Sequence, residues 1–154
     1  MQYPEINPKT KELWTEEDFK NLGEVKSFSE MYAIAETILS RMPASVDQVC
    51  GPITTGGLGS IELNLNHLND SVKKLQDEGV DVFDQLPFEK TIHRIFGDTT
   101  LAQGHQDILN DFYKPIFESG RITTLYFVSG WQSSKGAQWE HAQAINLSIR
   151  IVYL

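Results

Sequence analysis

The chain has 154 residues, 40% of them hydrophobic, which suits a single domain with one sizeable core. Its net charge of −8 disfavours binding to a nucleic acid polymer, and its single cysteine excludes an internal disulfide. No apolar run is long enough to span a membrane, and the polar N-terminus, with Glu5, does not resemble a signal peptide. We therefore expect a soluble, cytoplasmic protein with no membrane partner.

The first third of the chain predicts an arm, a helix and a strand. Residues 1–27 are polar and interrupted by prolines, so we expect an extended arm with one short helix near 15–22. Apolar residues recur at helical spacing over 28–42, and Pro43 ends that helix. The short apolar run 46–50 predicts a strand.

The middle of the chain begins with a loop, 51–60, that contains four glycines. Ser60 is a candidate N-cap for the amphipathic helix that follows, and Gly79 ends that helix. We expect a second strand at 80–83. An irregular connection comes next, with one short helix near 88–96.

The last third alternates helices with strands. Residues 105–118 predict a helix with a break near Pro115, and 122–128 predict a strand that is apolar on both faces. A helix over 134–147 and a final strand over 149–153 complete the chain. This alternation favours an α/β fold with a mostly parallel sheet covered by helices on both faces.

Two loops rich in Gly, Ser and Thr, 51–60 and 129–136, follow expected strands. In open α/β sheets, ligands bind at the carboxyl ends of the strands, so we expect these loops to converge there. Glycine-rich backbone allows close approach of an anion, and a helix N-terminus offers free amides. Loop 51–60 lacks the lysine of a Walker motif, however. Phosphate binding and a plain strand-to-helix turn therefore both remain open.

Glu140 stands out in the helix after the second loop because small residues surround it. It lies one turn after Gly136 and one turn before Ala144, with Ala137 on the same side. Small neighbours leave room for a ligand above the carboxylate. The alternative is a solvated glutamate on the outer face of the helix.

The second loop and its helix also carry a pattern that resembles a known family. The pattern is GW-x2-S-x-GA-x2-E-x3-A, formed by Gly130, Trp131, Ser134, Gly136, Ala137, Glu140 and Ala144. Together with CGPITTGG at 50–57, it resembles the nucleoside 2-deoxyribosyltransferase-like superfamily, which includes the nucleoside 5′-monophosphate N-glycosidases. The resemblance covers about residues 46–154 and leaves 1–45 as an N-terminal arm and helix.

The resemblance implies a flavodoxin-like or Rossmann-like three-layer sandwich and cleavage of an N-glycosidic bond. It implies that Glu140 is the nucleophile on C1′ of a nucleoside or nucleotide, that no cofactor is needed, and that the protein is a homodimer or larger. The positions that it implies for substrate and phosphate contacts are Gly51, Pro52, Ile53, Thr54, Thr55, Gly56, Gly57, Ser133, Ser134 and Gly136. Whether water or a second base accepts the sugar stays open, as does the identity of the base.

The aspartate usual in the family falls at Thr123 here, which puts catalysis in question. Asp84 and Asp111 are candidate replacements; a non-catalytic nucleotide-binding or sensor domain is the alternative. Trp131, Asp84 and Phe88 are candidate contacts to the base or sugar. For Phe88 we favour packing, and for Asp84 and Glu89 a solvated loop.

The remaining candidate sites in the sequence rest on less specific patterns. The stretch TGGLGSIEL, residues 55–63, also resembles the loop of cytokinin-activating phosphoribohydrolases, although Thr55 stands where that family has proline. The four histidines have no spacing typical of metal ligands, so we expect no metal site. Cys50, within an expected strand, is predicted to be buried and inert.

Overall fold

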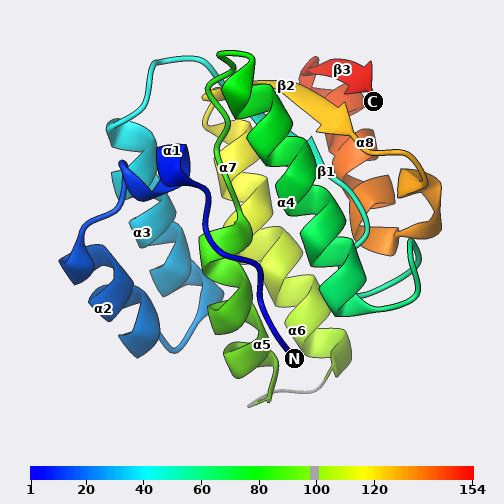
Figure 1. Ribbon diagram of the computed structural model, residues 1–154. Helices are drawn as coiled ribbons and strands as arrows, with labels where there is room; N and C mark the ends of the chain where they lie inside the picture. The colour runs from blue at the N-terminus through cyan, green and yellow to red at the C-terminus, as the bar shows by residue number, and fades with distance from the viewer. Residues whose placement is uncertain (98–100) are drawn as a thin grey trace.

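The computed structural model describes residues 1–97 and 101–154 and has a mixed α/β fold (Figure 1). Its sheet has three parallel strands in the order β1-β2-β3. These strands are β1 (Val46–Cys50), β2 (Ile122–Phe127) and β3 (Arg150–Tyr153). All three agree with strands predicted from the sequence.

Helices make up most of the remaining described residues. The longer ones agree with the predicted ranges, and serine or threonine caps begin α2, α3, α4 and α8. The helices are α1 (Pro8–Lys11), α2 (Glu16–Glu24), α3 (Phe28–Ser40), α4 (Ile61–Asp77), α5 (Glu89–Gly97), α6 (Leu101–Ile108), α7 (Lys114–Glu118) and α8 (Lys135–Leu147), with short 3₁₀ turns η1 (Leu86–Phe88) and η3 (Trp131–Ser133) and a π-helical turn η2 (Leu109–Tyr113).

The strand predicted at 80–83 is reduced to one parallel bridge, between Val82 and Asp47. Two backbone hydrogen bonds hold it: the amide of Asp47 donates to Asp81, and the amide of Phe83 donates to Asp47. Pairing ends there because the chain turns at Asp84, whose carboxylate accepts the amide of Leu86 at 3.0 Å. The segment still lies beside β1.

The helix predicted over 105–118 is divided into α6, η2 and α7. Pro115 lies in the first turn of α7 and has no amide N–H to donate. The backbone widens into the π-helical turn just before it, which confirms the predicted break.

Side chains of β1 and β2 alternate between two apolar clusters. Val49 and Val128 pack with Leu68 and Val72 of α4 on one face. The larger cluster contains Cys50 and residues of β2, together with side chains from α2, α3, α5, α7 and α8. The strands therefore contact helices through two separate apolar clusters.

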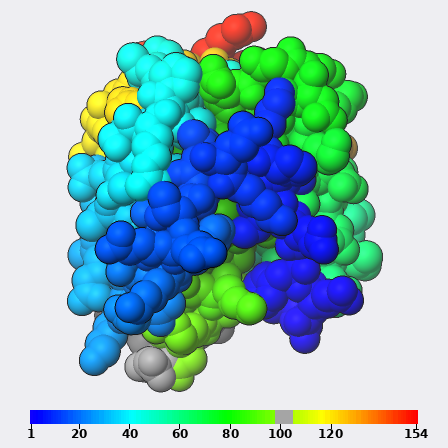
Figure 2. All heavy atoms as spheres, turned by 60° about the vertical axis from the view of Figure 1, so that its left-hand side comes forward, coloured from blue at the N-terminus to red at the C-terminus, as the bar shows by residue number. Residues whose placement is uncertain are grey.

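Residues 1–45 belong to this larger core. Trp14, Leu22 and Val25 are buried in it. Figure 2 shows the arm, in blue, lying on the surface between the cyan and green segments. The Nδ2 of Asn69 in α4 donates to the carbonyl of Glu5 at 3.1 Å, which fixes the arm to its own chain.

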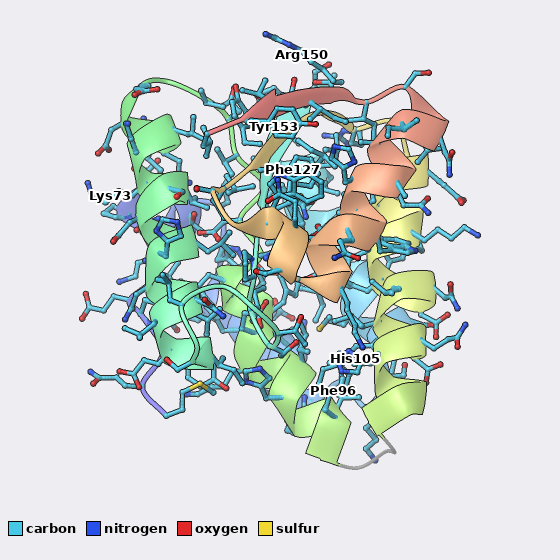
Figure 3. All side chains as sticks on the ribbon, turned by 90° about the vertical axis from the view of Figure 1, so that its right-hand side faces the viewer. Lys73, Phe96, His105, Phe127, Arg150 and Tyr153 are labelled. Atoms are coloured by element: carbon cyan, nitrogen blue, oxygen red, sulfur yellow. The ribbon has the colours of Figure 1, made fainter. Side chains whose placement is uncertain are left out.

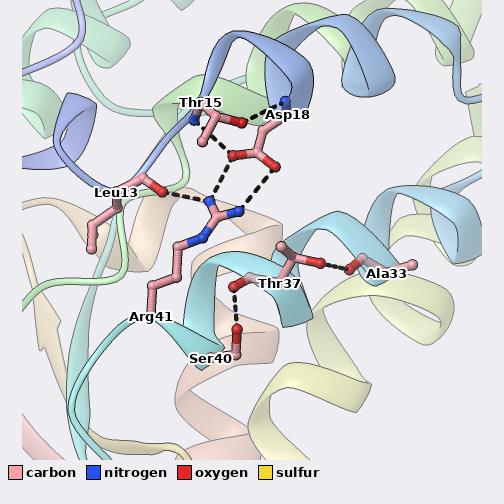
Figure 4. A network of polar contacts seen from close by, with 7 residues as sticks. All are labelled: Leu13, Thr15, Asp18, Ala33, Thr37, Ser40 and Arg41. Carbon is pink, nitrogen blue, oxygen red and sulfur yellow. Dashed lines mark hydrogen bonds and ion pairs between the residues drawn. The ribbon is translucent and has the colours of Figure 1, made fainter.

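A polar network joins the start of α2 to the end of α3 (Figure 4). Arg41 donates to Asp18 at 2.6 Å and to the carbonyl of Leu13 at 2.7 Å. Asp18 also accepts the backbone amide of Thr15, and the Thr15 hydroxyl accepts the amide of Asp18, forming a capping box. The hydrogen bond from Arg41 lowers the pKa of Asp18.

We expect Asp18→Ala to lower the free energy of unfolding by about 1–2 kcal/mol at pH 7, because the Thr15 amide loses its acceptor in the capping box and the charged pair with Arg41 is lost. Since the pKa of Asp18 is lowered in the folded state, this stability is present above the unfolded pKa and is lost as the pH falls through the folded one. Urea unfolding at several pH values measures the difference. Asp77→Ala, which removes an exposed pair with Lys73, should lower the free energy of unfolding clearly less than Asp18→Ala does; equal losses would contradict this account.

Candidate active site

The loops after β1 and β2 touch, as the sequence predicts. The amide of Gly57 donates to the Ser133 hydroxyl at 2.8 Å, and the amide of Lys135 donates to the Thr55 hydroxyl at 3.3 Å. Gly56 has a φ of +67°, and a Cβ there would lie 2.2 Å from the carbonyl oxygen of Ser133. The two loops therefore form one continuous wall at the carboxyl ends of the strands.

A cavity of about 580 Å³ lies beside this wall. Among its lining residues are seven of the predicted site residues: Gly51, Ile53, Thr54, Thr55, Ser134, Gly136 and Glu140. Gly56 and Gly57 line a second, smaller cavity of about 340 Å³. Pro52 is buried, and Ser133 bridges the loops.

The opposite wall of the large cavity comes from α5, α6 and η2. Ile92, Ile108 and Leu109 make it largely apolar. Phe96 and His105 lie against each other there, with ring centroids 5.2 Å apart, at the end of the molecule remote from Phe127 and Tyr153 (Figure 3). The cavity therefore combines a polar loop wall with an apolar helical wall.

Glu140 faces this cavity and is only 7% exposed, so the outward, solvated alternative is excluded. Ser134 caps α8 and accepts the amide of Ala137, which places the carboxyl in the second helical turn. The small residues Ala137 and Ala144 are fully buried on the same side of the helix.

Two residues of β1 donate to Glu140. The thiol of Cys50 donates to Oε2 at 3.2 Å, and Nε2 of Gln48 lies 3.5 Å from the same oxygen. Gln48 also donates to Gln85 Oε1 at 3.3 Å. The strand alternation puts positions 48 and 50 on one face. The sequence did not predict that Gln48 and Cys50 contact Glu140. A glutamine within a buried strand nevertheless indicates that a polar partner lies nearby.

The protonation of Glu140 is set mainly by its burial. A position in the first turns of a helix favours the ionised form of a carboxyl, but burial raises the pKa of Glu140 to about 8. The hydrogen bond from Cys50 acts in the opposite direction and is the smaller effect. Burial and Glu140 together raise the pKa of the Cys50 thiol, so this cysteine remains a protonated donor.

Glu89 is the second carboxyl of the cavity, and our expectation of a solvated loop there was wrong. It begins α5 and is 1% exposed. Burial, with Glu140 and Asp84 as charged neighbours, raises the pKa of Glu89 to about 8. Its Oε1 has no hydrogen-bond partner within the described part of the chain. No sequence motif marks this residue, because its burial depends on the packing of α5.

The candidate replacements for the missing aspartate lie elsewhere. Asp84 is also buried rather than solvated, but it accepts from Thr10 at 2.8 Å and does not line the cavity. Asp111 is likewise not among the lining residues. Thr123 is exposed near the amino end of β2, whereas the loops follow the carboxyl end. Glu89 is thus the acid that neighbours Glu140.

The two aromatic candidates pack against protein. Phe88 is fully buried in the core, as favoured from the sequence, and contacts Trp14 and Phe112. Trp131 stacks on His141, with ring centroids 4.3 Å apart and planes 14° from parallel. Neither lines the large cavity.

No family model, curated protein or solved structure matches this chain. Within the described residues, no group of three or more His, Cys, Asp or Glu side chains is arranged to hold a metal ion. The same residues include no helix long and apolar enough to cross a membrane.

The loop contact predicts different effects for two glycines with positive φ. Gly56→Ala should cost about 1–3 kcal/mol more than Gly59→Ala, because only position 56 would force a methyl group into backbone atoms of Ser133. Gly59 has a φ of +93°, but a methyl group added there would meet nothing within 4 Å, so it controls for backbone strain alone. Chemical denaturation measures both variants, and equal costs would show that the loops are not held together.

The buried carboxyls predict a stability that falls with rising pH. Their ordinary pKa is 4.5 and their folded pKa is about 8, so the folded state binds more protons across this window. Glu89→Gln and Glu140→Gln should therefore gain stability relative to the wild type as the pH rises from 5 to 8. Glu118→Gln, at an exposed position, is the control. A gain that does not change with pH would contradict the shifts.

Proposed function

We propose that this protein cleaves the N-glycosidic bond of a nucleoside or nucleoside 5′-monophosphate through a glycosyl ester on Glu140. One observation carries the proposal: Glu140 and Glu89 are both buried and both line the cavity beside the two loops. Paired carboxyls, one a nucleophile and one an acid and base, are what retaining glycosidic cleavage requires.

The proposed fold is the flavodoxin-like sandwich. Its support is the parallel bridge that places 80–83 beside β1, because the spatial order then becomes 80–83, β1, β2 and β3. In that order the strand sequence reverses between β1 and β2. The loops that line the cavity follow these two strands, where ligands bind in doubly wound folds.

The hydrogen bonds assign different roles to the two carboxyls. Glu140 accepts from Cys50 and faces the amide of Gln48, and both donors favour its ionised form. Glu89 has a neighbouring charge on Glu140, which raises its pKa, and one oxygen without a donor. When the pair shares one proton, Glu89 therefore holds it. Glu140 is the proposed nucleophile and Glu89 the proposed general acid.

The proposed reaction has two steps. A carboxylate oxygen of Glu140 bonds to C1′ while the bond from C1′ to the base nitrogen breaks, and the base takes its electron pair and the proton of Glu89. Water, or a second base, then attacks C1′ as the Glu89 carboxylate removes the proton of the acceptor. The ester bond to Glu140 breaks and its carboxylate is restored.

The loop wall is the proposed site for the sugar and any 5′-phosphate. Lys135, which the sequence analysis did not select, adds a cation to the lining beside Thr54 and Thr55. The amide of Gly57 is already bonded to Ser133, so it is not a free donor for phosphate. The apolar wall then faces the base.

Binding without catalysis is the second candidate function. The apolar wall formed by Ile92, Ile108 and Leu109 suits a nucleotide sensor as well as an enzyme. The two candidates differ in whether base is released.

The homodimer implied by the resemblance is also a proposal. The N-terminal arm packs on its own chain, so it is not the proposed contact. Exposed apolar residues near β3, such as Ile145 and Leu154, are the proposed contact between the two copies.

A screen of nucleosides and 5′-monophosphates for released base tests the proposal. On any cleaved substrate, Glu140→Ala and Glu140→Gln should lower kcat by about 10³-fold or more, because the covalent step is lost. Glu118→Gln, at an exposed glutamate, should retain wild-type turnover. Unchanged turnover in either Glu140 variant would exclude it as nucleophile. Tight nucleotide binding without base release would favour the sensor.

A further inference from the structure

A line of polar side chains leads from the buried carboxyl of Glu89 to the N-terminal arm. His93 lies one helical turn after Glu89 on α5, and its Nε2 is 4.0 Å from Glu89 Oε2. The other ring nitrogen, Nδ1, is 2.6 Å from the hydroxyl of Tyr3. Tyr3 is partly exposed, so the line reaches from the cavity to solvent.

Two atoms in this line are buried without a hydrogen-bond partner: Nε2 of His93 and Oε1 of Glu89. Unpaired buried polar atoms are costly and rare. A side-chain rotation that shortens the distance from Nε2 to Oε2 by about 1 Å makes a hydrogen bond of ordinary length. Residues at i and i+4 on a helix are placed for such a contact.

Charged and titratable groups lie near both ends of this line of side chains. Glu140 and Asp84 face Glu89 from outside α5, and Glu89 in turn acts on Tyr113 of η2. Lys90 lies over the ring of Tyr3, with Nζ 5.8 Å from its centroid. Burial lowers the pKa of His93, so its ring is neutral near pH 7 and has one donor and one acceptor nitrogen.

We propose that Tyr3 and His93 form the path by which Glu89 exchanges its proton with solvent. The path has two states, each with a neutral imidazole. In the first, Glu89 donates its proton to Nε2 and the Nδ1–H donates to the Tyr3 oxygen. In the second, the Nε2–H donates to the Glu89 carboxylate and Nδ1 accepts from the Tyr3 hydroxyl.

Conversion between these states moves one proton along each link. The proton of Glu89 passes to Nε2, the proton on Nδ1 passes to the Tyr3 oxygen, and the hydroxyl proton of Tyr3 passes to water. The reverse sequence reprotonates Glu89. No group gains or loses charge except Glu89 and the solvent, so the path carries a proton without a charged histidine.

The catalytic role of this path rests on the proposed function. After Glu89 gives its proton to the leaving base, the second state supplies an Nε2–H donor to the carboxylate that forms. His93 and Tyr3 are then positioning residues that act through Glu89. The state of the path itself is measurable without substrate.

Nitrogen NMR of the full chain with ¹⁵N-labelled histidine tests the path. As the pH rises through about 8, the pKa of Glu89, the His93 proton should move from Nδ1 to Nε2. Glu89→Gln should abolish this change. Tyr3→Phe should shift its midpoint by about one pH unit, because a hydrogen bond to the ring is lost. His141, which is 2.7 Å from the Tyr153 hydroxyl, is an internal control that should not respond to Glu89→Gln.

A His93 tautomer that stays the same from pH 6 to pH 9, or a change that persists in Glu89→Gln, would overturn the proposal. If the tautomer changes but no nucleoside or nucleotide is cleaved, the path stands and the proposed function fails. If base is released, Tyr3→Phe and His93→Gln should displace the limb of the pH profile that reports Glu89, whereas Lys90→Ala should leave it in place. If only Lys90→Ala displaced this limb of the pH profile, the effect would come from charge near Tyr3, and the proposed path would be rejected.

Discussion

The parallel pairing of β1 with β2 is the constraint on which the candidate site depends. Cys50 pairs with Phe127 at the carboxyl ends of the two strands, so the loops that follow begin side by side. Their contact through Gly57 and Ser133 closes the wall of the cavity. The same pairing sets which side chains of β1 lie under α8, and thereby brings Gln48 and Cys50 to the carboxyl of Glu140.

Burial of two carboxyls in one cavity costs free energy, and the packing of the remaining fold offsets this cost. Two carboxyls buried in one cavity cannot both ionise easily, because each loses hydration and each opposes the charge of the other. Glu140 receives donors from β1, whereas one oxygen of Glu89 has no partner in the described residues. Strongly shifted carboxyls inside a cavity are typical of functional sites, and this asymmetry underlies the proposed assignment of Glu140 as nucleophile and Glu89 as general acid.

The N-terminal residues contribute to the site from a distance. Their apolar side chains belong to the core that buries α5, and Tyr3 reaches His93 on that helix. Thr10 donates a hydrogen bond to Asp84, a carboxylate that neighbours Glu89. The segment outside the family resemblance is thus part of the environment of the second carboxyl.

The sequence by itself determined the three strands, the helices and the convergence of the loops. Each follows from local signals: apolar runs, serine caps and glycine turns. The small residues around Glu140 left its orientation open, and only the tertiary structure shows that it faces the cavity. Tertiary structure alone decided the burial of Glu89, the donors to Glu140 and the single bridge at Val82. These depend on contacts between residues far apart in the chain, and desolvation, which sets the pKa of both glutamates, has no signature in a local pattern.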